Sequence, residues 1–340
     1  MPQREPVEVV IPLRWDAPGD VGELAAYLKD LSQWADVTVV DGSPDPLFDV
    51  HASAWAPHAR HIRPQPLHPG RFGHNAKVDG AMTGVRQARH ELVVLADDDV
   101  RYDERALRQL ATRLNHADLV RPANVFSAWP WHARWDGART LLNRAVAADW
   151  PGTFGVRRSV LLRTAGWDRD VMFENLELVR TVRAAGGRVV DSPEILVRRR
   201  PPEAVQFRNQ RVRQAYDDLA QPWRLAAALA TVPAAVLALR RRPIWLLTFV
   251  LGSVAVAEAG RRRAGARTYV PADVPLFAPL WVLERGVCSW LAVAARLLGG
   301  VRYRGKRLRL AANSMRTLRR RHADAALFTA PGRRGDEGID

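Results

Sequence analysis

The chain has 340 residues, a formal net charge of +15 and one cysteine, Cys288. A single cysteine excludes an intramolecular disulfide and a cysteine-based zinc site, and the positive charge indicates an anionic partner. The sequence has no zinc-finger spacing and no RNA-binding aromatic motif, so we expect no nucleic-acid partner. The arginine clusters flank apolar segments, which favours membrane headgroups. These clusters lie at residues 198–200, 240–242, 261–263 and 318–321.

The first ninety residues alternate between short apolar runs and segments with helical spacing. Residues 7–12 and 37–40 have the length and β-branched content of buried strands, and proline is expected to stop the first one. Residues 22–34 carry apolar side chains at helical spacing, and a third short strand is expected at 61–64. This alternation predicts an α/β fold with a mostly parallel, doubly wound sheet.

Three consecutive acids, Asp97, Asp98 and Asp99, follow directly after a predicted strand at residues 92–96. Asp103 then precedes a segment with helical spacing, which it can cap. Open α/β sheets bind their ligands at the carboxyl ends of the strands. Adjacent carboxylates repel one another, and oxygen ligands suit Mg²⁺ or Mn²⁺ held together with nucleotide phosphates. A solvated acidic turn is the alternative interpretation.

Two further polar positions can contact a nucleotide. Asp41 ends the second strand and precedes Gly-Ser, where a carboxylate can accept two hydrogen bonds from a base or ribose. A plain Asp-Gly turn explains the same residues. Lys77 begins the helix before the acidic strand and can reach a diphosphate, although a lone helix lysine can simply be solvated.

The second half of the domain adds another pair of acids and a basic cluster. Glu174 and Glu177 lie three residues apart at the start of a predicted helix. A carboxylate in such a position can act as a general base, or it can only complement the helix dipole. Arginine and glutamine residues crowd the segment 206–216, where they offer bidentate donors for a diphosphate.

Taken in order, these motifs resemble those of family 2 glycosyltransferases with the GT-A fold, over residues 7–216. Residues 75–79, Asn-Ala-Lys-Val-Asp, are also similar to the Asn-x-Lys-Val-Asn segment of ceramide glucosyltransferase-like members. The matching segments are Val-Val-Ile-Pro, Val-Val-Asp-Gly-Ser, Asp97-Asp98-Asp99, Arg157-Arg158 followed by Gly-Trp-Asp, Glu174-Asn-Leu-Glu and Gln210-Arg-Val-Arg-Gln.

The resemblance implies a nucleotide-sugar site. It places Asp41 at the nucleotide base, and Asp97 and Asp99 around a Mg²⁺ or Mn²⁺ ion as the DxD pair. Gln210 and Arg213 would belong to the element that grips the diphosphate. We expect Lys77 and Asp98 among the nucleotide-sugar-binding residues as well.

The catalytic base departs from the family pattern. The usual Glu-Asp pair is Glu174-Asn175 in this chain, and an amide cannot take a proton at neutral pH. Either Glu174 acts as the base, with Glu177 as the fallback candidate, or the chain is a non-catalytic scaffold on a membrane.

Beyond residue 222 the composition becomes apolar. The segments 225–239 and 244–257 are shorter than the roughly 20 residues that span a bilayer, which indicates interfacial helices or the arms of a hairpin. The segment 274–298 is long enough, but its Glu284 and Arg285 would have to face protein. A buried helical hairpin of a soluble domain is the alternative.

These observations predict three parts: a GT-A domain at residues 1–222, membrane-associated helices at 223–300 and a basic, mostly disordered cytoplasmic tail at 301–340. Basic residues after the last apolar segment indicate a cytoplasmic C-terminus. The residues at the N-terminus form no apolar signal region, so we expect the GT-A domain to face the cytoplasm from the cell membrane. The expected reaction is an inverting transfer from a nucleotide-diphospho-sugar to a lipid or lipid-linked acceptor.

Overall fold

The computed structural model describes residues 4–67, 71–164, 166–303 and 305–329. Over these residues, eight strands form one sheet in the order β3-β2-β1-β4-β7-β6-β8-β5. Only β7 and β5 run against the other strands of this sheet, so the predicted mostly parallel α/β fold is confirmed. The strands are β1 Val7–Leu13, β2 Asp36–Asp41, β3 Arg60–Ile62, β4 Leu92–Ala96, β5 Val100–Arg101, β6 Leu119–Phe126, β7 Thr153–Arg157 and β8 Val189–Arg199.

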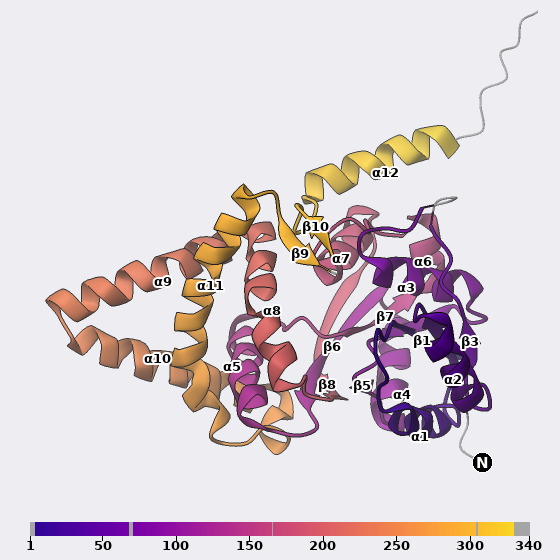
Figure 1. Cartoon of the computed structure of the whole chain (residues 1–340), viewed down its shortest axis with the longest axis horizontal. Coiled ribbons are helices and arrows are strands. Elements are labelled where there is room, and N and C mark those ends of the chain that lie inside the picture. Colours follow the sequence, from indigo (N-terminus) through magenta and orange to yellow (C-terminus); the bar gives the residue numbers. More distant parts are fainter. Residues whose placement is uncertain (1–3, 68–70, 165, 304, 330–340) are drawn as a thin grey trace, which may run out of the picture.

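Helices cover both faces of this sheet, and a second group of helices stands to one side of it (Figure 1). The longer helices are α1 Val21–Leu31, α2 Asp45–Trp55, α3 Ala76–Gln87, α4 Glu104–Leu114, α5 Trp131–Val146, α6 Arg158–Arg163, α7 Glu174–Ala184, α8 Ala204–Tyr216, α9 Pro222–Arg241, α10 Ile244–Arg262, α11 Ala278–Leu297 and α12 Met315–Thr329. The short elements are the 3-10 helices η1 Asp217–Ala220, η2 Arg263–Thr268 and η3 Val274–Phe277, and the hairpin strands β9 Val301–Tyr303 and β10 Lys306–Leu308.

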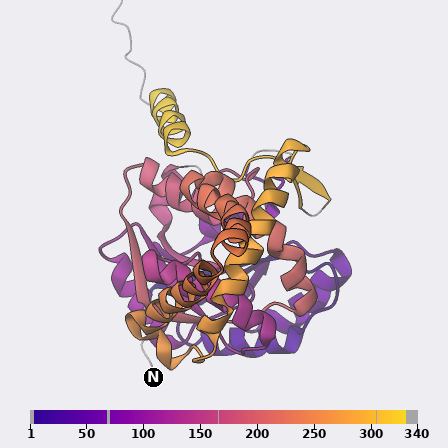
Figure 2. The same cartoon turned by 90° about the vertical axis from the view of Figure 1, so that its left-hand side faces the viewer.

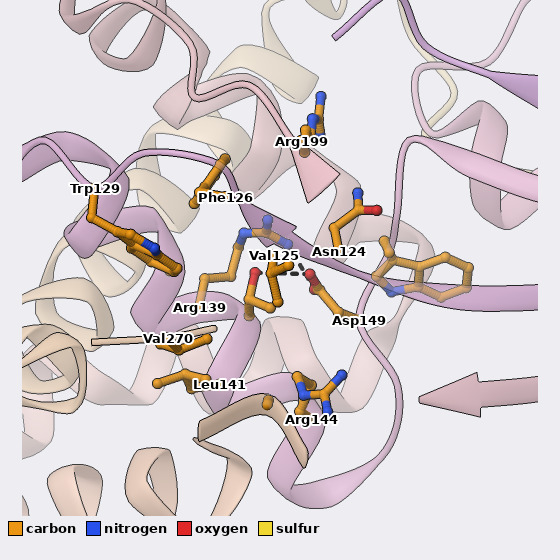
Figure 3. A pocket seen from close by; sticks show the side chains of 14 residues that line it. Asn124, Val125, Phe126, Trp129, Arg139, Leu141, Arg144, Asp149, Arg199 and Val270 are labelled. Atoms are coloured by element: carbon orange, nitrogen blue, oxygen red, sulfur yellow. Dashed lines mark hydrogen bonds and ion pairs between the residues drawn. The ribbon is translucent and has the colours of Figure 1, made fainter. Parts of the chain in front are cut away.

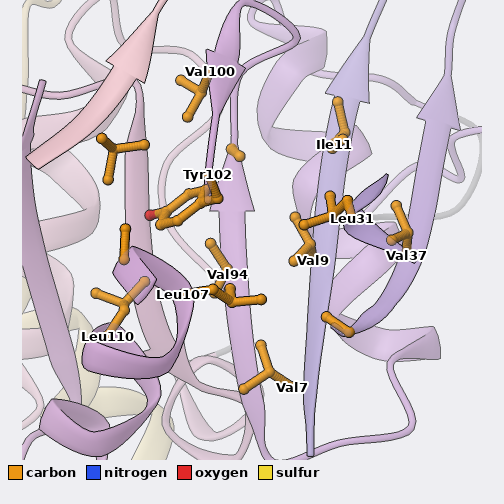
Figure 4. Packing of buried hydrophobic residues seen from close by; sticks show 14 of the residues in the cluster. Val7, Val9, Ile11, Leu31, Val37, Val94, Val100, Tyr102, Leu107 and Leu110 are labelled. Carbon is orange, nitrogen blue, oxygen red and sulfur yellow. The ribbon is translucent and has the colours of Figure 1, made fainter. Parts of the chain in front are cut away.

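Strand β1 has apolar side chains on both of its faces because both faces are covered. Val9 and Ile11 face the cluster formed with α1 and α4 (Figure 4), while Val10 faces the cluster formed with α3. Helix α4 begins at its predicted cap, since the Asp103 carboxylate accepts a hydrogen bond from the Ala106 backbone nitrogen at 2.8 Å. These layers place the carboxyl ends of β2 and β4 at one edge of the sheet.

Two details of the sheet differ from expectation. Strand β1 continues through Pro12 to Leu13, because its pairing with β4 ends at Val10 and only β2 accompanies it further. Strand β6 was not expected, since Arg121 and Asn124 interrupt its apolar pattern. Its pairing with β8 shifts register between Arg121 and Ala123, which accommodates the intervening proline.

The helices α9 and α10 form a hairpin that projects away from the sheet, and α11 packs along α8 and α5 (Figures 1 and 2). Within the described residues, three helical stretches are long and apolar enough to cross a membrane, judged by length and composition alone: Pro222–Arg241, Ile244–Thr268 and Val274–Leu297. The first two helices are therefore longer than their apolar runs suggested. They are also largely exposed, which contradicts the alternative of a buried hairpin.

The charged pair within α11 faces protein, as predicted. Trp135 on α5 donates its indole N–H to Glu284 at 2.7 Å. The Arg285 guanidinium donates to Asp218 on η1 at 2.8 Å. Both charges are thus satisfied by the sheet domain and the element that follows α8.

The segment after α11 returns to the sheet domain, which corrects the expectation of a mostly disordered tail from residue 301. The backbone nitrogens of Met172 and Phe173 donate to the carbonyls of Leu310 and Ala311 at 2.9 and 2.8 Å. The same region also contains the helix α12. The remaining residues of the predicted tail, 330–340, lie outside the described part of the chain.

Candidate active site

The acidic motif lies where β4 ends. The backbone nitrogen of Asp97 donates to the carbonyl of Gly152 at 2.8 Å, which joins the end of β4 to the loop before β7. A Cβ atom on residue 152 would overlap the Asp97 carboxylate, so a glycine is needed here to leave room for that side chain. The fold thus reserves space at the strand end for an acidic group.

Lys77 connects this motif to the candidate base. Its Nζ lies 2.5 Å from Asp97 Oδ1 and 2.9 Å from Glu174 Oε1. Burial lowers the pKa of Lys77, but the two carboxylates outweigh burial and hold that pKa well above its usual value. The amine is therefore a permanent positive charge between the first turn of α7 and the end of β4.

A second cation, Arg199, lies on the other side of the acidic motif. Its Nε donates to Asp99 Oδ2 at 2.8 Å, and its Nη2 lies 3.8 Å from Asp97 Oδ2. Burial raises the pKa of Asp99, Arg199 opposes this rise, and Asp97 and Asp98 add to it. Arg200 pairs with Glu23 at 2.6 Å, so two members of the arginine cluster at 198–200 bind acids of the sheet domain and not, as predicted, membrane headgroups.

The middle acid of the motif contacts the neighbouring strand end through Trp15. The Trp15 indole donates to Asp98 Oδ2 at 2.7 Å. The backbone nitrogen of Trp15 donates to Ser43 Oγ at 2.9 Å. Trp15, in the loop after β1, therefore joins the acidic motif to the Asp-Gly-Ser motif after β2. In the sequence these two motifs are separate features.

Asp41 is fully buried beneath this arrangement. Its Oδ1 accepts a hydrogen bond from the Ser43 backbone nitrogen at 2.8 Å, and its Oδ2 lies 2.7 Å from His51 Nδ1 and 3.0 Å from His61 Nε2. Burial raises the pKa of Asp41, but these hydrogen bonds outweigh burial and hold that pKa far below its usual value. Both oxygens thus have protein partners, and contact with a nucleotide base stays a prediction.

The two glutamates of α7 have different surroundings. The Glu174 carboxylate contacts Lys77 in the candidate site and keeps 17% of its side-chain surface exposed. Glu177 is completely buried and accepts hydrogen bonds from the backbone nitrogen and the side-chain amide of Asn313 at 2.7 and 2.8 Å. Glu177 is therefore buried against Asn313, and the structure does not support it as the fallback base.

The helix α8 carries Gln210 and Arg213 and ends at a further acid, Asp217. Arg213 lies with its guanidinium carbon 5.4 Å from the ring centroid of Tyr303, and Gln210 is half-buried one turn earlier. Burial raises the pKa of Asp217 well above its usual value; Glu174 adds to this rise, whereas Arg285 and Arg213 oppose it. A carboxyl group at the end of α8 thus lies within electrostatic range of the candidate base.

A small cavity lies behind Arg199, between β6 and α5 (Figure 3). Its volume of about 20 Å³ is close to that of one bound water molecule. Arg139 and Asp149 form an ion pair of 2.8 Å at its wall. The cavity is too small for a sugar.

Three of these residues were missed from the sequence: Trp15, Arg199 and Asp217. Trp15 carried a usable signal, since it lies only three residues after the predicted end of the first strand and so had to lie near that end of the sheet. Arg199 belongs to the arginine cluster that was expected at membrane headgroups, so its position at the end of β8 was not foreseen. Asp217 gave no signal beyond its place after the basic helix.

The acidic motif fits a divalent cation that is shared with a ligand. Within the described residues, no group of three or more His, Cys, Asp or Glu side chains could hold a metal by itself. Mg²⁺ is commonly held by one or two carboxylates together with substrate phosphates, so a full protein cage is not required. Asp99 Oδ1 is buried without a hydrogen-bond partner, which leaves one oxygen next to Asp97 available for a cation.

The chain is similar to proteins of one known family. The family model described as "Glycosyltransferase like family 2" matches residues 37–217. No curated protein matches the chain. Among solved structures, the mannosyltransferase PcManGT from Pyrobaculum calidifontis, in complex with GDP-Man and Mn²⁺, is similar with 19% identity and a TM-score of 0.47, over 85% of this chain and 88% of that one.

A second similar structure is glucosyl-3-phosphoglycerate synthase from Mycobacterium tuberculosis, in complex with Mn²⁺ and UDP-Glc. It has 19% identity and a TM-score of 0.43, over 63% of this chain and 78% of that one. These TM-scores lie below 0.5, so neither likeness bears on the donor or acceptor of this chain.

Proposed function

The chain belongs to the glycosyltransferase-like family 2, and from this premise we propose that it transfers a sugar from a nucleotide-diphospho-sugar to a hydroxyl group of a lipid or lipid-linked acceptor. The observation that carries the proposal is the contact of Lys77 with both Asp97 and Glu174. It brings the predicted donor-binding motif and the predicted base to opposite sides of one amine.

The donor is proposed to bind at the end of β4. Asp97 and Asp99 would hold Mg²⁺ or Mn²⁺, which would supply positive charge for the leaving diphosphate. Arg213, with Gln210 one turn before it, would add donors toward the same group. Asp41, Lys77 and Asp98 complete the proposed donor site.

The proposed chemistry is a direct displacement with inversion. Glu174 accepts the proton of the acceptor hydroxyl while the hydroxyl oxygen forms a bond to the anomeric carbon. The bond from that carbon to the diphosphate oxygen breaks, and the electron pair leaves with the nucleoside diphosphate. Lys77 lies against Glu174 and holds the carboxylate at the edge of the cleft, which positions it for this step.

The contacts between η1 and the apolar helix α11 support a lipid acceptor. Asp217 is within electrostatic range of Glu174, and the adjacent Asp218 binds Arg285 on the apolar helix α11. Asp217 and Asp218 are consecutive residues, so the proposed base and the helix α11 act on neighbouring positions of η1. The similarity of residues 75–79 to ceramide glucosyltransferase-like members agrees with such an acceptor.

A transfer assay tests the proposal. The full-length protein is reconstituted in vesicles made from a lipid extract of the source cells and supplied with a panel of radiolabelled nucleotide sugars. We expect label to move into the organic phase with wild type and with Glu194→Gln, which changes an exposed glutamate far from the cleft, but not with Glu174→Gln.

The alternative is a non-catalytic membrane scaffold, which the amide at Asn175 favours. Absence of transfer and of donor hydrolysis with every nucleotide sugar, in a protein that still binds a donor, would support the scaffold. Lipid analysis of a deletion strain separates the two readings in the cell, since loss of one sugar from one lipid requires an enzyme. We expect the protein at the cell membrane with its GT-A domain in the cytoplasm.

A further inference from the structure

The chain enters and leaves its apolar helices on the same side. Helix α8 precedes α9 and packs against the sheet domain's α5 through the Arg211–Asp136 ion pair of 3.0 Å. After α11, Asn313 contacts Glu177 on α7, which belongs to the same domain. An odd number of membrane crossings would put residues 301–314 across the bilayer from the domain they contact, so the three helices cannot all be spans.

Helix α11 is attached along its length to elements that do not belong in a bilayer. Its buried face contacts α5, α8 and η1 through Trp281, Glu284 and Arg285. Helix α8 lies beside it and exposes the polar side chains of Arg208 and Asn209. A membrane crossing by α11 would carry these groups into hydrocarbon, where polar side chains are expensive.

The other face of α11 and of the short helix before it is apolar and exposed. Its residues recur at helical spacing, which produces one continuous stripe. The residues of this stripe are Leu276, Leu280, Leu283, Val287, Trp290, Leu291 and Leu297. A helix with one protein-bound face and one apolar open face is suited to lie along the surface of a membrane.

The free part of the α9–α10 hairpin is too short to span. Helix α11 crosses α9 where Gly286 contacts Thr231 and Val232, and α10 is packed against α5 from Ala257 onward. The free arms, residues 233–241 and 244–256, extend about 14 and 20 Å at a rise of about 1.5 Å per residue. The hydrocarbon core of a bilayer is about 30 Å thick, so an upright hairpin would end inside it.

The tip of the hairpin consists of three exposed arginines, Arg240, Arg241 and Arg242. In an upright hairpin these guanidinium groups would lie within hydrocarbon, which is strongly unfavourable. In a hairpin parallel to the membrane they can reach the headgroups, where anionic lipids attract basic residues. Exposed apolar side chains, among them Trp245, Leu247 and Leu251, would then lie below the headgroups of the same leaflet.

We propose that α9, α10 and the apolar stripe of α11 lie in the plane of one anionic leaflet, on the side of the catalytic domain, and that none of them crosses the membrane. This inference rests on the membrane association in the proposed function and specifies its form. An in-plane arrangement would hold the candidate active site at the level of the headgroups. The hydroxyl group of a lipid acceptor could then reach the site while the lipid stays in its leaflet.

Cysteine accessibility tests the arrangement with the full-length protein in native membranes. Single-cysteine variants are made in a Cys288→Ser background, one at the hairpin tip, Arg241→Cys, and one on the exposed surface of the sheet domain, Gln33→Cys. Each is treated with a membrane-impermeant maleimide in right-side-out spheroplasts and in inside-out vesicles. We expect both positions to be labelled in the same preparation and protected in the other.

Labelling of the two positions in opposite preparations would overturn the proposal, because the tip would then lie across the bilayer. If Cys288→Ser fails to accumulate, the wild-type background serves as well, because the buried native thiol can be measured alone and subtracted.

The choice of an anionic leaflet is tested by flotation. Wild type should float more strongly with vesicles containing phosphatidylglycerol than with pure phosphatidylcholine vesicles. Replacement of Arg240, Arg241 and Arg242 by glutamine should reduce that preference by roughly tenfold or more. Equal flotation of wild type with both vesicle types would contradict the anionic leaflet. A protein that floats with neither but still binds a donor would contradict membrane association and leave the sugar-transfer site standing.

Discussion

The two acids at the start of α7 contact two different regions of the molecule. Glu174 lies at the candidate site, where it shares Lys77 with Asp97. Three residues later, Glu177 has no exposed surface and binds Asn313 of the segment that follows the apolar helices. One glutamate thus borders the candidate site, and the other binds the C-terminal segment.

The difference shows what separates a candidate base from a structural acid. Spacing along a helix predicts that two side chains share a face, but it does not predict which element covers each of them. Asn313 lies 136 residues after Glu177 in the chain, and its side-chain amide donates a hydrogen bond to the buried Glu177 carboxylate. The choice between the two candidate bases therefore depends on a long-range contact that the local sequence pattern does not predict.

The largest expected effect comes from neutralising Glu174, the acid at the candidate site. Glu174→Gln should lower kcat by about 10²–10⁴, because general-base assistance is lost, while donor affinity stays nearly unchanged. Asn175→Asp, which restores the usual acid of the family, should recover part of that loss. Steady-state kinetics and donor calorimetry on both variants make the measurement. Full turnover in Glu174→Gln would show that another group takes the proton.

A change at the contact between Asn313 and Glu177 should lower the stability of the fold. Asn313→Ala removes the amide that binds Glu177 and leaves a buried carboxylate oxygen without its partner, which should cost about 1–3 kcal/mol of unfolding free energy. Thermal melting in detergent measures the loss. Asn209→Ala, an exposed change on α8, is the matched control. An Asn313→Ala variant as stable as the control would mean that the C-terminal segment does not hold α7.

The smallest expected effect is a change in pH dependence. Burial raises the pKa of Glu177 above its ordinary value of 4.5, although Asn313 opposes the rise. The folded protein therefore keeps this proton to a higher pH than the unfolded chain does. The stabilising contribution is complete below pH 4.5 and is lost as pH rises through the folded pKa.

Glu177→Gln should flatten that part of the stability profile, as measured by melting temperature between pH 4 and pH 8. Glu194→Gln, at an exposed position, should leave the profile unchanged. Identical profiles for wild type and Glu177→Gln would contradict the raised pKa.

Much of the sheet domain could be predicted because its elements are locally consistent. The strand 92–96, the cap at Asp103 and the apolar face of α4 were all read from the sequence and are confirmed. These features follow from short-range patterns of burial and hydrogen bonding. Strand β6 was missed because arginine, proline and asparagine break its pattern, and only a register shift allows the pairing.

The parts of the candidate site that could not be predicted depend on distant contacts. Trp15 reaches Asp98 across 83 residues and Arg199 reaches Asp99 across 100 residues. Arg199 was assigned to a basic surface, since the sequence shows a charge cluster but not its partners. Similarly, the basic composition after residue 301 predicted disorder, although the backbone there pairs with Met172 and Phe173.

Donor calorimetry tests most directly whether the acidic strand end is a nucleotide-sugar site. Wild type, Asp99→Asn and Asp103→Asn are titrated with UDP- and GDP-sugars, with Mg²⁺ or Mn²⁺ present and with EDTA. Asp103→Asn keeps the cap of α4 and controls for loss of an acid nearby. We expect one nucleotide sugar to bind wild type and Asp103→Asn only with metal, and Asp99→Asn to bind it at least tenfold more weakly. Unchanged, EDTA-insensitive affinity in Asp99→Asn would contradict the account.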